Sequence, residues 1–187
     1  YNNALKTAIE WQVISTKQLQ PDISLDEILY ISEKKCGFSS LLWASVLDEC
    51  WTKEEEQFIY QSGFVGQIVN DLFDAFKDRT DGVFTIVRNA DTVQNAAAIF
   101  QKECTRLHQL ILQTNAPKPL QIKTIRRMAC IHAFGLVSLE HLQNTENKYG
   151  IPMNWDLPLR KELVTDMAFW SNKFKLLHYA CKMAEWR

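Results

Sequence analysis

The sequence predicts an all-α protein, on three observations. Apolar residues recur at intervals of three to five along most of the chain, which is the spacing of one buried helix face. Two Ser/Thr-x-x-Glu sequences, Ser24 to Glu27 and Thr52 to Glu55, are typical of helix N-termini, because the two residues satisfy each other's exposed amides. No stretch alternates apolar and polar residues as a paired strand does. With 187 residues and 47% hydrophobic content, we expect one helical domain over residues 1–187.

The first half of the chain contains signals for four helices. Pro21 ends the first helix, the capping box at Ser24 opens the second, and Gly37 interrupts it. The capping box at Thr52 begins a long helix, which Asp81-Gly82 ends. The expected helices are residues 1–18, 24–35, 38–50 and 53–79. In the first of them, the residues expected to face the core are Leu5, Ala8, Ile9, Val13 and Ile14.

The second half predicts three further helices joined by loops. The short apolar run 83–87 is expected to be a loop, because a single strand has nothing to pair with. The segment 115–119 is a turn by composition, and the polar segment 143–154 is expected to be a loop around Gly150 and Pro152. The expected helices are residues 91–113, 120–142 and 157–186. Within the second of these, Gly135 favours close helix packing or a kink.

Composition and charge exclude several classes of protein. The formal net charge is −1 and no block of basic residues occurs, so nucleic acid and anionic membrane surfaces are not expected partners. No apolar run of 18 residues occurs, so no membrane span is expected. The five cysteines are odd in number and form no Cys-x-x-Cys pair, which is typical of reduced core thiols in a cytoplasmic protein. The four histidines lack zinc-ligand spacing.

A line of acidic and amide side chains marks the end of the long predicted helix. Residues four apart lie on one helix face, so Asn70, Asp74 and Asp78 present oxygen ligands on three successive turns. Apolar residues surround this line, namely Leu72, Phe73, Ala75 and Phe76. They indicate that the helix is buried, so the line would face a cavity. Such ligands suit Mg²⁺, with Mn²⁺ as the alternative. The other interpretation is a solvated acidic face that pairs with Lys77 and Arg79.

Four stretches around this line resemble the class I isoprenoid synthase superfamily. The stretch 28–37, ending in Lys35-Cys36-Gly37, resembles the segment of trans-prenyl diphosphate synthases that ends in Lys-Thr. The stretch 66–74 looks like their second aspartate-rich motif, with Gly and Gln before Asp-Asp-x-x-Asp. The stretch 70–82 is similar to the Asn, Ser, Glu metal triad of class I terpene cyclases, and Lys148-Tyr149 resembles their Arg-Tyr pair.

The chain departs from these patterns at several positions. Asp74 replaces the Ser or Thr of a cyclase and Asp78 replaces its Glu, whereas Cys36 replaces the Thr of a synthase. Lys148 replaces Arg, which keeps the charge but loses the bidentate fork. The first aspartate-rich motif is missing from the sequence. We therefore expect an isoprenoid synthase-like helical bundle that lacks its N-terminal helices.

The resemblance implies a terpene synthase that ionises a prenyl diphosphate and cyclises the resulting carbocation. Mg²⁺ or Mn²⁺ would be bound by Asn70, Asp74 and Asp78, with Asp71 as an additional ligand. The residues implied to bind the diphosphate are Lys35, Lys77, Lys148 and Tyr149. The aromatic candidates for the walls of the carbocation pocket are Phe38, Trp43, Phe64 and Phe134.

Two alternatives to a cyclase stay open at this point. The first is a trans-prenyl diphosphate synthase that extends the substrate with isopentenyl diphosphate, although the run 83–87 lacks the lysines that such enzymes usually carry there. The second is a non-catalytic subunit of a heteromeric synthase, which the missing first motif favours. The resemblance also allows a homodimer.

Overall fold

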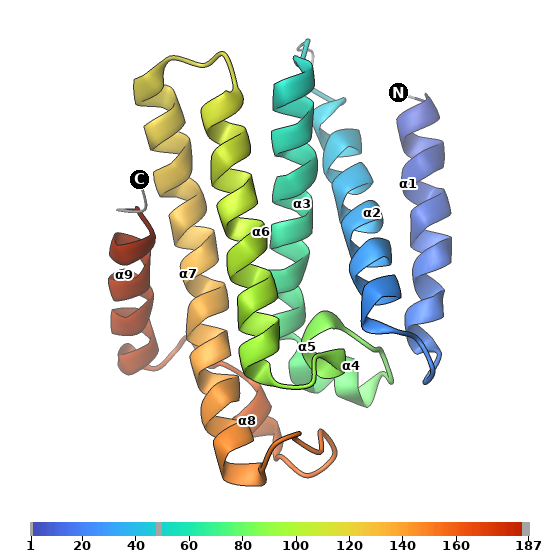
Figure 1. Cartoon of the computed structure of the whole chain (residues 1–187), viewed down its shortest axis with the longest axis vertical. Coiled ribbons are helices and arrows are strands. Elements are labelled where there is room, and N and C mark those ends of the chain that lie inside the picture. The colour runs from blue at the N-terminus through green and yellow to red at the C-terminus, as the bar shows by residue number, and fades with distance from the viewer. Residues whose placement is uncertain (1, 48–49, 185–187) are drawn as a thin grey trace.

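The computed structural model describes residues 2–47 and 50–184, and all regular elements in these two ranges are helical (Figure 1). The prediction of an all-α protein is therefore confirmed for this part of the chain. The elements are α1 (Asn2–Ile14), the 3-10 helix η1 (Ser15–Leu19), α2 (Leu25–Ala44), α3 (Lys53–Phe73), α4 (Ala75–Thr80), α5 (Ile86–Asn89), α6 (Val93–Gln113), α7 (Lys118–Tyr149), α8 (Arg160–Leu163) and α9 (Trp170–Ala184).

Five long helices lie side by side with roughly parallel axes, namely α1, α2, α3, α6 and α7 (Figure 1). Helix α3 contacts α2 on one side and both α6 and α7 on the other, and α9 packs against α7. The short helices α4, α5 and α8 gather at the lower end of the view in Figure 1, where α3 ends. The C-terminal end of α3 therefore lies next to α4 and α5, and α8 contacts α4 in turn.

The predicted helix starts are confirmed by their capping hydrogen bonds. The Ser24 hydroxyl accepts from the Glu27 amide at 3.2 Å, and the Thr52 hydroxyl accepts from the Glu55 amide at 3.2 Å. In return the Glu55 carboxylate accepts from the Thr52 amide at 2.9 Å. These reciprocal bonds fix where α2 and α3 begin, and hence which residues lie opposite each other along the pair.

Gly37 does not interrupt α2, contrary to the prediction. The helix continues from Leu25 to Ala44, and a Cβ atom on Gly37 would collide with the ring of Tyr60 on α3. The glycine is therefore needed for close helix packing rather than for a break. Gly135 has the same role on α7, where a Cβ atom would lie 2.6 Å from Cζ of Phe100 on α6.

The predicted helix 53–79 is bent at Asp74, which separates α3 from α4. Asp74 has φ −88° and ψ 11°, outside the helical values. Two helical backbone hydrogen bonds, each from an amide to the carbonyl four residues earlier, remain around Asp74. The Asp74 amide donates to the Asn70 carbonyl and the Asp78 amide donates to the Asp74 carbonyl, both at 2.8 Å. The chain thus changes direction within a nearly helical path, and the acidic line is shared between two helices.

Helix α7 is longer than predicted, because the polar segment after Leu142 continues it to Tyr149. Glu146 in that segment is buried, and its carboxylate accepts a hydrogen bond at 2.9 Å from the amide of Val93 at the start of α6. Gly150, with φ 101°, then ends the helix in a conformation that suits glycine. Polar composition alone therefore misplaced the boundary.

Two other predicted boundaries were wrong. The expected helix 157–186 is divided into α8 and α9, because Val164 adopts extended backbone angles between them. The expected loop 83–87 contains the first residues of the single-turn helix α5. Each error concerns a short helix whose few residues carry little periodic signal.

The outer faces of the bundle also differ from expectation. Ala8 of α1 is buried as predicted, whereas Leu5, Ile9 and Val13 are exposed. All five cysteines are free, but only Cys104 is fully buried. In the described residues, none of the helices combines the length and the apolar character needed to cross a membrane.

Candidate functional site

A chain of hydrogen bonds connects α2 to the acidic end of α3. The Cys36 thiol donates to Oε1 of Gln67 at 2.9 Å, and Nε2 of Gln67 donates to Oδ1 of Asp71 at 2.6 Å. The ammonium group of Lys35 is near enough to lower the pKa of Asp71 by its charge. The structure thus brings together the Lys35-Cys36 and Gln67-to-Asp71 segments, which are 31 residues apart in sequence.

Asp71 is an acidic residue inside the protein. The residue is 2% exposed, and its Oδ2 atom has no hydrogen-bond partner among the described residues. Burial raises the pKa of Asp71 to about 7, and the charge of Asp78 acts in the same direction against the hydrogen bond from Gln67. Asp71 is therefore close to the midpoint of its titration at neutral pH.

Asp78 is the second buried acid of the site. Burial, followed by the nearby charge of Asp74, raises the pKa of Asp78 to about 6, although Lys77 and Arg88 oppose this rise. The Arg88 guanidinium donates to the backbone carbonyl of Asp78 at 3.1 Å. Arg88 thereby holds the backbone of α4 in place without neutralising the carboxylate by a direct ion pair.

Asn70 and Asp74 complete the group at its solvent side. Asn70 is exposed and Asp74 is half-buried, and Nδ2 of Asn70 donates to Oδ2 of Asp74 at 3.3 Å. The predicted line therefore runs from solvent at Asn70 to the interior at Asp78, instead of facing a single cleft from one straight helix. We call Asn70, Asp71, Asp74 and Asp78 the acid cluster.

The acid cluster offers the kind of ligand that Mg²⁺ prefers. In the described residues, no three His, Cys, Asp or Glu side chains already converge as a metal site would require. Mg²⁺ is commonly held by one or two carboxylates, with water and substrate phosphates completing its coordination. The charge of Asp78 disfavours the ionised form of Asp71, and the charge of Asp74 disfavours that of Asp78. A divalent cation would relieve this repulsion. The donor chemistry therefore fits the ion.

An apolar hollow adjoins the acid cluster between α3 and α7. It has a volume of about 310 Å³ and is lined by Gly66, Val69, Asn70, Phe73 and Phe134. The rings of Phe73 and Phe134 lie with their centroids 6.0 Å apart. Asn70 belongs both to this hollow and to the acid cluster, so it marks the point where the polar and apolar surfaces meet.

The hollow contains residues that the sequence interpretation had not selected. Phe134 was a predicted wall residue, but Gly66, Val69 and Phe73 were not. Together with Asn70 they occupy positions i, i+3, i+4 and i+7, the spacing of one helix face, and this signal would have identified them. The other predicted aromatic residues lie elsewhere: Phe64 is in the core, Trp43 is exposed, and Phe38 packs edge-on against Tyr60 at 5.4 Å.

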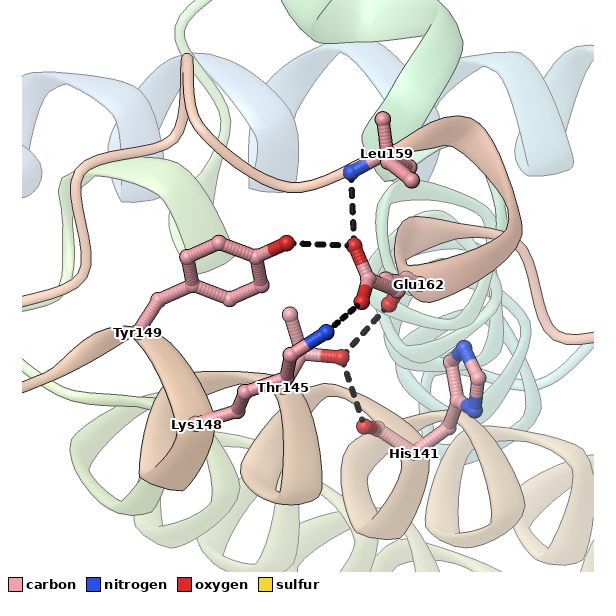
Figure 2. A network of polar contacts seen from close by, with 6 residues as sticks. All are labelled: His141, Thr145, Lys148, Tyr149, Leu159 and Glu162. Atoms are coloured by element: carbon pink, nitrogen blue, oxygen red, sulfur yellow. Dashed lines mark hydrogen bonds and ion pairs between the residues drawn. The ribbon is translucent and has the colours of Figure 1, made fainter.

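The predicted diphosphate ligands do not form one group. Lys35 lies beside the acid cluster, whereas Lys77 is exposed and pairs with Asp81 at 3.0 Å. Lys148 and Tyr149, at the end of α7, both donate to the carboxylate of Glu162 on α8, as Figure 2 shows. Sequence reasoning missed Glu162, since no motif distinguishes it from other surface acids.

The site therefore consists of an acid cluster, an adjoining apolar hollow, and a separate Lys148-Tyr149 pair whose donors already have an acceptor. No protein-family model, curated protein or solved structure matches the chain.

Proposed function

We propose that this protein binds a prenyl diphosphate across the acid cluster and the apolar hollow and ionises it, as class I terpene synthases do. The observation that carries the proposal is the position of Asn70, which lines the hollow and donates to Asp74 of the cluster. A prenyl diphosphate has the same division, with a charged head directly attached to an apolar chain. The motif resemblance supports the assignment to an isoprenoid synthase-like bundle.

The acid cluster positions the polar head of the substrate. Asn70, Asp74 and Asp78 would hold Mg²⁺, which supplies positive charge that stabilises the departing diphosphate as the allylic carbon-oxygen bond breaks. Gln67 holds Asp71 in place at 2.6 Å, so that this buried carboxylate stays directed at the cluster. Lys35 adds a cation on the α2 side.

The hollow offers an apolar surface on which the hydrocarbon chain would lie. Phe73 and Phe134 present aromatic rings to it, and a ring face attracts a cation by about 0.5–2 kcal/mol. Val69 and Gly66 add apolar surface and space. These groups suit contact with an apolar chain and with a carbocation formed on it.

The test is the release of diphosphate from farnesyl or geranylgeranyl diphosphate. We expect release with Mg²⁺ or Mn²⁺ and none in excess EDTA, with hydrocarbon or alcohol as the organic product. Equal turnover in EDTA would refute the mechanism. A longer prenyl diphosphate as the main product after addition of isopentenyl diphosphate would favour the chain-elongating synthase instead.

A non-catalytic helical subunit is the second candidate. Helix α1 exposes Leu5, Ile9 and Val13, which lie four residues apart on one face, and such a stripe is typical of a surface that another helix covers. This function predicts a stable complex with another synthase chain and no turnover by the isolated chain. Activity of the isolated chain would exclude it.

A further inference from the structure

Three hydrogen-bond donors converge on the carboxylate of Glu162 (Figure 2). The Lys148 ammonium group contacts one oxygen, Oε1. The other oxygen, Oε2, accepts from the Tyr149 hydroxyl at 2.7 Å and from the Leu159 amide at 2.7 Å. An ammonium group, a phenol and a backbone amide thus form a cradle around a single anionic group.

The cradle keeps its occupant charged. The hydrogen bonds from Lys148, Tyr149 and Leu159 lower the pKa of Glu162 to about 2, so the carboxylate is ionised at neutral pH. The side chain of Glu162 is 14% exposed and that of Lys148 is 62% exposed. An anion arriving from solvent therefore meets Lys148 first. It needs to replace only the carboxylate of Glu162 as the acceptor of these hydrogen bonds.

The backbone of Glu162 is held separately from its side chain. The Thr145 hydroxyl donates to the Glu162 carbonyl at 2.6 Å, and this bond does not involve the carboxylate (Figure 2). The carboxylate can therefore leave the cradle by side-chain rotation while α8 stays attached to α7. Displacement of the side chain does not require unfolding of the segment.

We infer that Glu162 is an internal competitor, which occupies Lys148 and Tyr149 until the phosphate group of a ligand displaces it. Phosphate oxygens accept the same charge-assisted hydrogen bonds as a carboxylate and carry more negative charge. The inference rests on the proposed function and assigns Lys148 and Tyr149 to the phosphate end of the same ligand. It adds that the pair is blocked in the ligand-free protein and is released by the substrate itself.

The experiment compares two matched variants. Glu162→Gln removes the competing charge but keeps an oxygen that accepts from the Leu159 amide. Glu140→Gln is the control, because Glu140 of α7 binds Lys175 at 2.6 Å and Tyr179 at 2.8 Å in an equivalent Lys-Tyr-Glu contact with α9. Binding of inorganic diphosphate is measured by calorimetry with Mg²⁺ present, and folding by circular dichroism.

We expect Glu162→Gln to bind inorganic diphosphate about 5- to 10-fold more tightly than wild type, as removal of a competing state does. Glu140→Gln should bind like wild type. Adding Lys148→Met to Glu162→Gln should remove the gain, because it removes the released donor. In wild type, diphosphate should also speed hydrogen exchange at the Leu159 amide, which loses its acceptor when the carboxylate leaves.

Failure of this inference differs from failure of the proposed function. Equal or weaker binding by Glu162→Gln refutes the competitor, and so does an absence of binding by both proteins. If Asp74→Ala and Asp78→Ala abolish binding while Glu162→Gln changes nothing, the proposed function stands and the competitor does not. If the Asp variants bind like wild type while Glu162→Gln binds more tightly, the competitor stands and the acid-cluster mechanism fails.

Discussion

The thiol of Cys36 lies 2.9 Å from the side-chain oxygen of Gln67, and this contact orients the opposite end of the Gln67 amide toward Asp71. Because the amide oxygen accepts from the thiol, the amide nitrogen is left to donate to the buried carboxylate. The side chain of Gln67 therefore links α2 to the acid cluster and determines where Oδ1 of Asp71 lies. The cluster depends on a neutral residue as much as on its acids.

Gln67→Ala should destabilise the protein by about 1–3 kcal/mol, because it leaves a buried carboxylate without its side-chain donor. The free energy of unfolding is measured by urea denaturation. Gln57→Ala, at an exposed position on the same helix, is the control and should change this free energy by less than about 0.5 kcal/mol. Equal stability of the two variants would show that the Gln67 contact has no energetic role.

Asp74→Ala and Asp78→Ala should each lower turnover of a prenyl diphosphate by at least about 10²-fold, because each removes an oxygen ligand of the proposed metal site. Both should also reduce the rise in melting temperature that Mg²⁺ causes in the wild-type protein. Asp91→Ala removes an exposed acid outside the cluster and should leave both properties unchanged. Wild-type turnover in both cluster variants would show that the reaction does not need these carboxylates and would refute the acid-cluster mechanism.

Gly66→Ala and Gly135→Ala should change stability in opposite directions. A Cβ atom on Gly66 meets no atom within 4 Å, so the alanine should stabilise α3 by up to about 1 kcal/mol through helix propensity. A Cβ atom on Gly135 would lie 2.6 Å from Phe100, and the overpacking should cost about 1–3 kcal/mol. Thermal unfolding of the two variants side by side tests both signs, and a loss at Gly66 would mean that the hollow is not open there.

His132 should make the protein less stable in acid. The residue is fully buried between α6 and α7, and burial, with the charge of His108, lowers the pKa of His132 from 6.5 to about 3. The unfolded chain then binds the proton more readily, so stability falls by up to about 1.4 kcal/mol per pH unit below about pH 6.5. His132→Leu should reduce the dependence of the urea denaturation midpoint on pH over this range. His178→Leu, at an exposed position, should leave that dependence unchanged. Parallel pH profiles for both variants and wild type would contradict this cause.

Helix starts could be predicted from the sequence where residues close together in the chain determine them. The capping boxes at Ser24 and Thr52 act through residues three positions apart, and both helix starts were predicted correctly. Boundaries set by distant contacts were not predictable in this way. Glu146 extends α7 because its carboxylate accepts from Val93, which is 53 residues away, and periodicity carries no information about that bond.

The candidate site was predicted as a set of residues but not as an arrangement. The four-residue spacing identified Asn70, Asp74 and Asp78, yet the bend at Asp74 and the burial of Asp71 depend on packing against α2 and α5. Lys148 and Tyr149 were selected by resemblance, and nothing in the sequence indicates that Glu162 binds them. Contacts between residues 13 or 14 positions apart, across the end of a helix, leave no periodic pattern.

The bend at Asp74 divides the proposed metal ligands between two helices that are anchored differently. Asn70 and the buried Asp71 belong to α3, whereas Asp78 belongs to α4. The guanidinium of Arg79, next to Asp78, donates to the carbonyls of Trp155 at 3.1 Å and Pro158 at 2.8 Å, just before α8. The position of α4 therefore depends on the segment that also carries Glu162, together with the Arg88 contact to the Asp78 carbonyl. A shift of that segment would act as an allosteric signal on the proposed metal site.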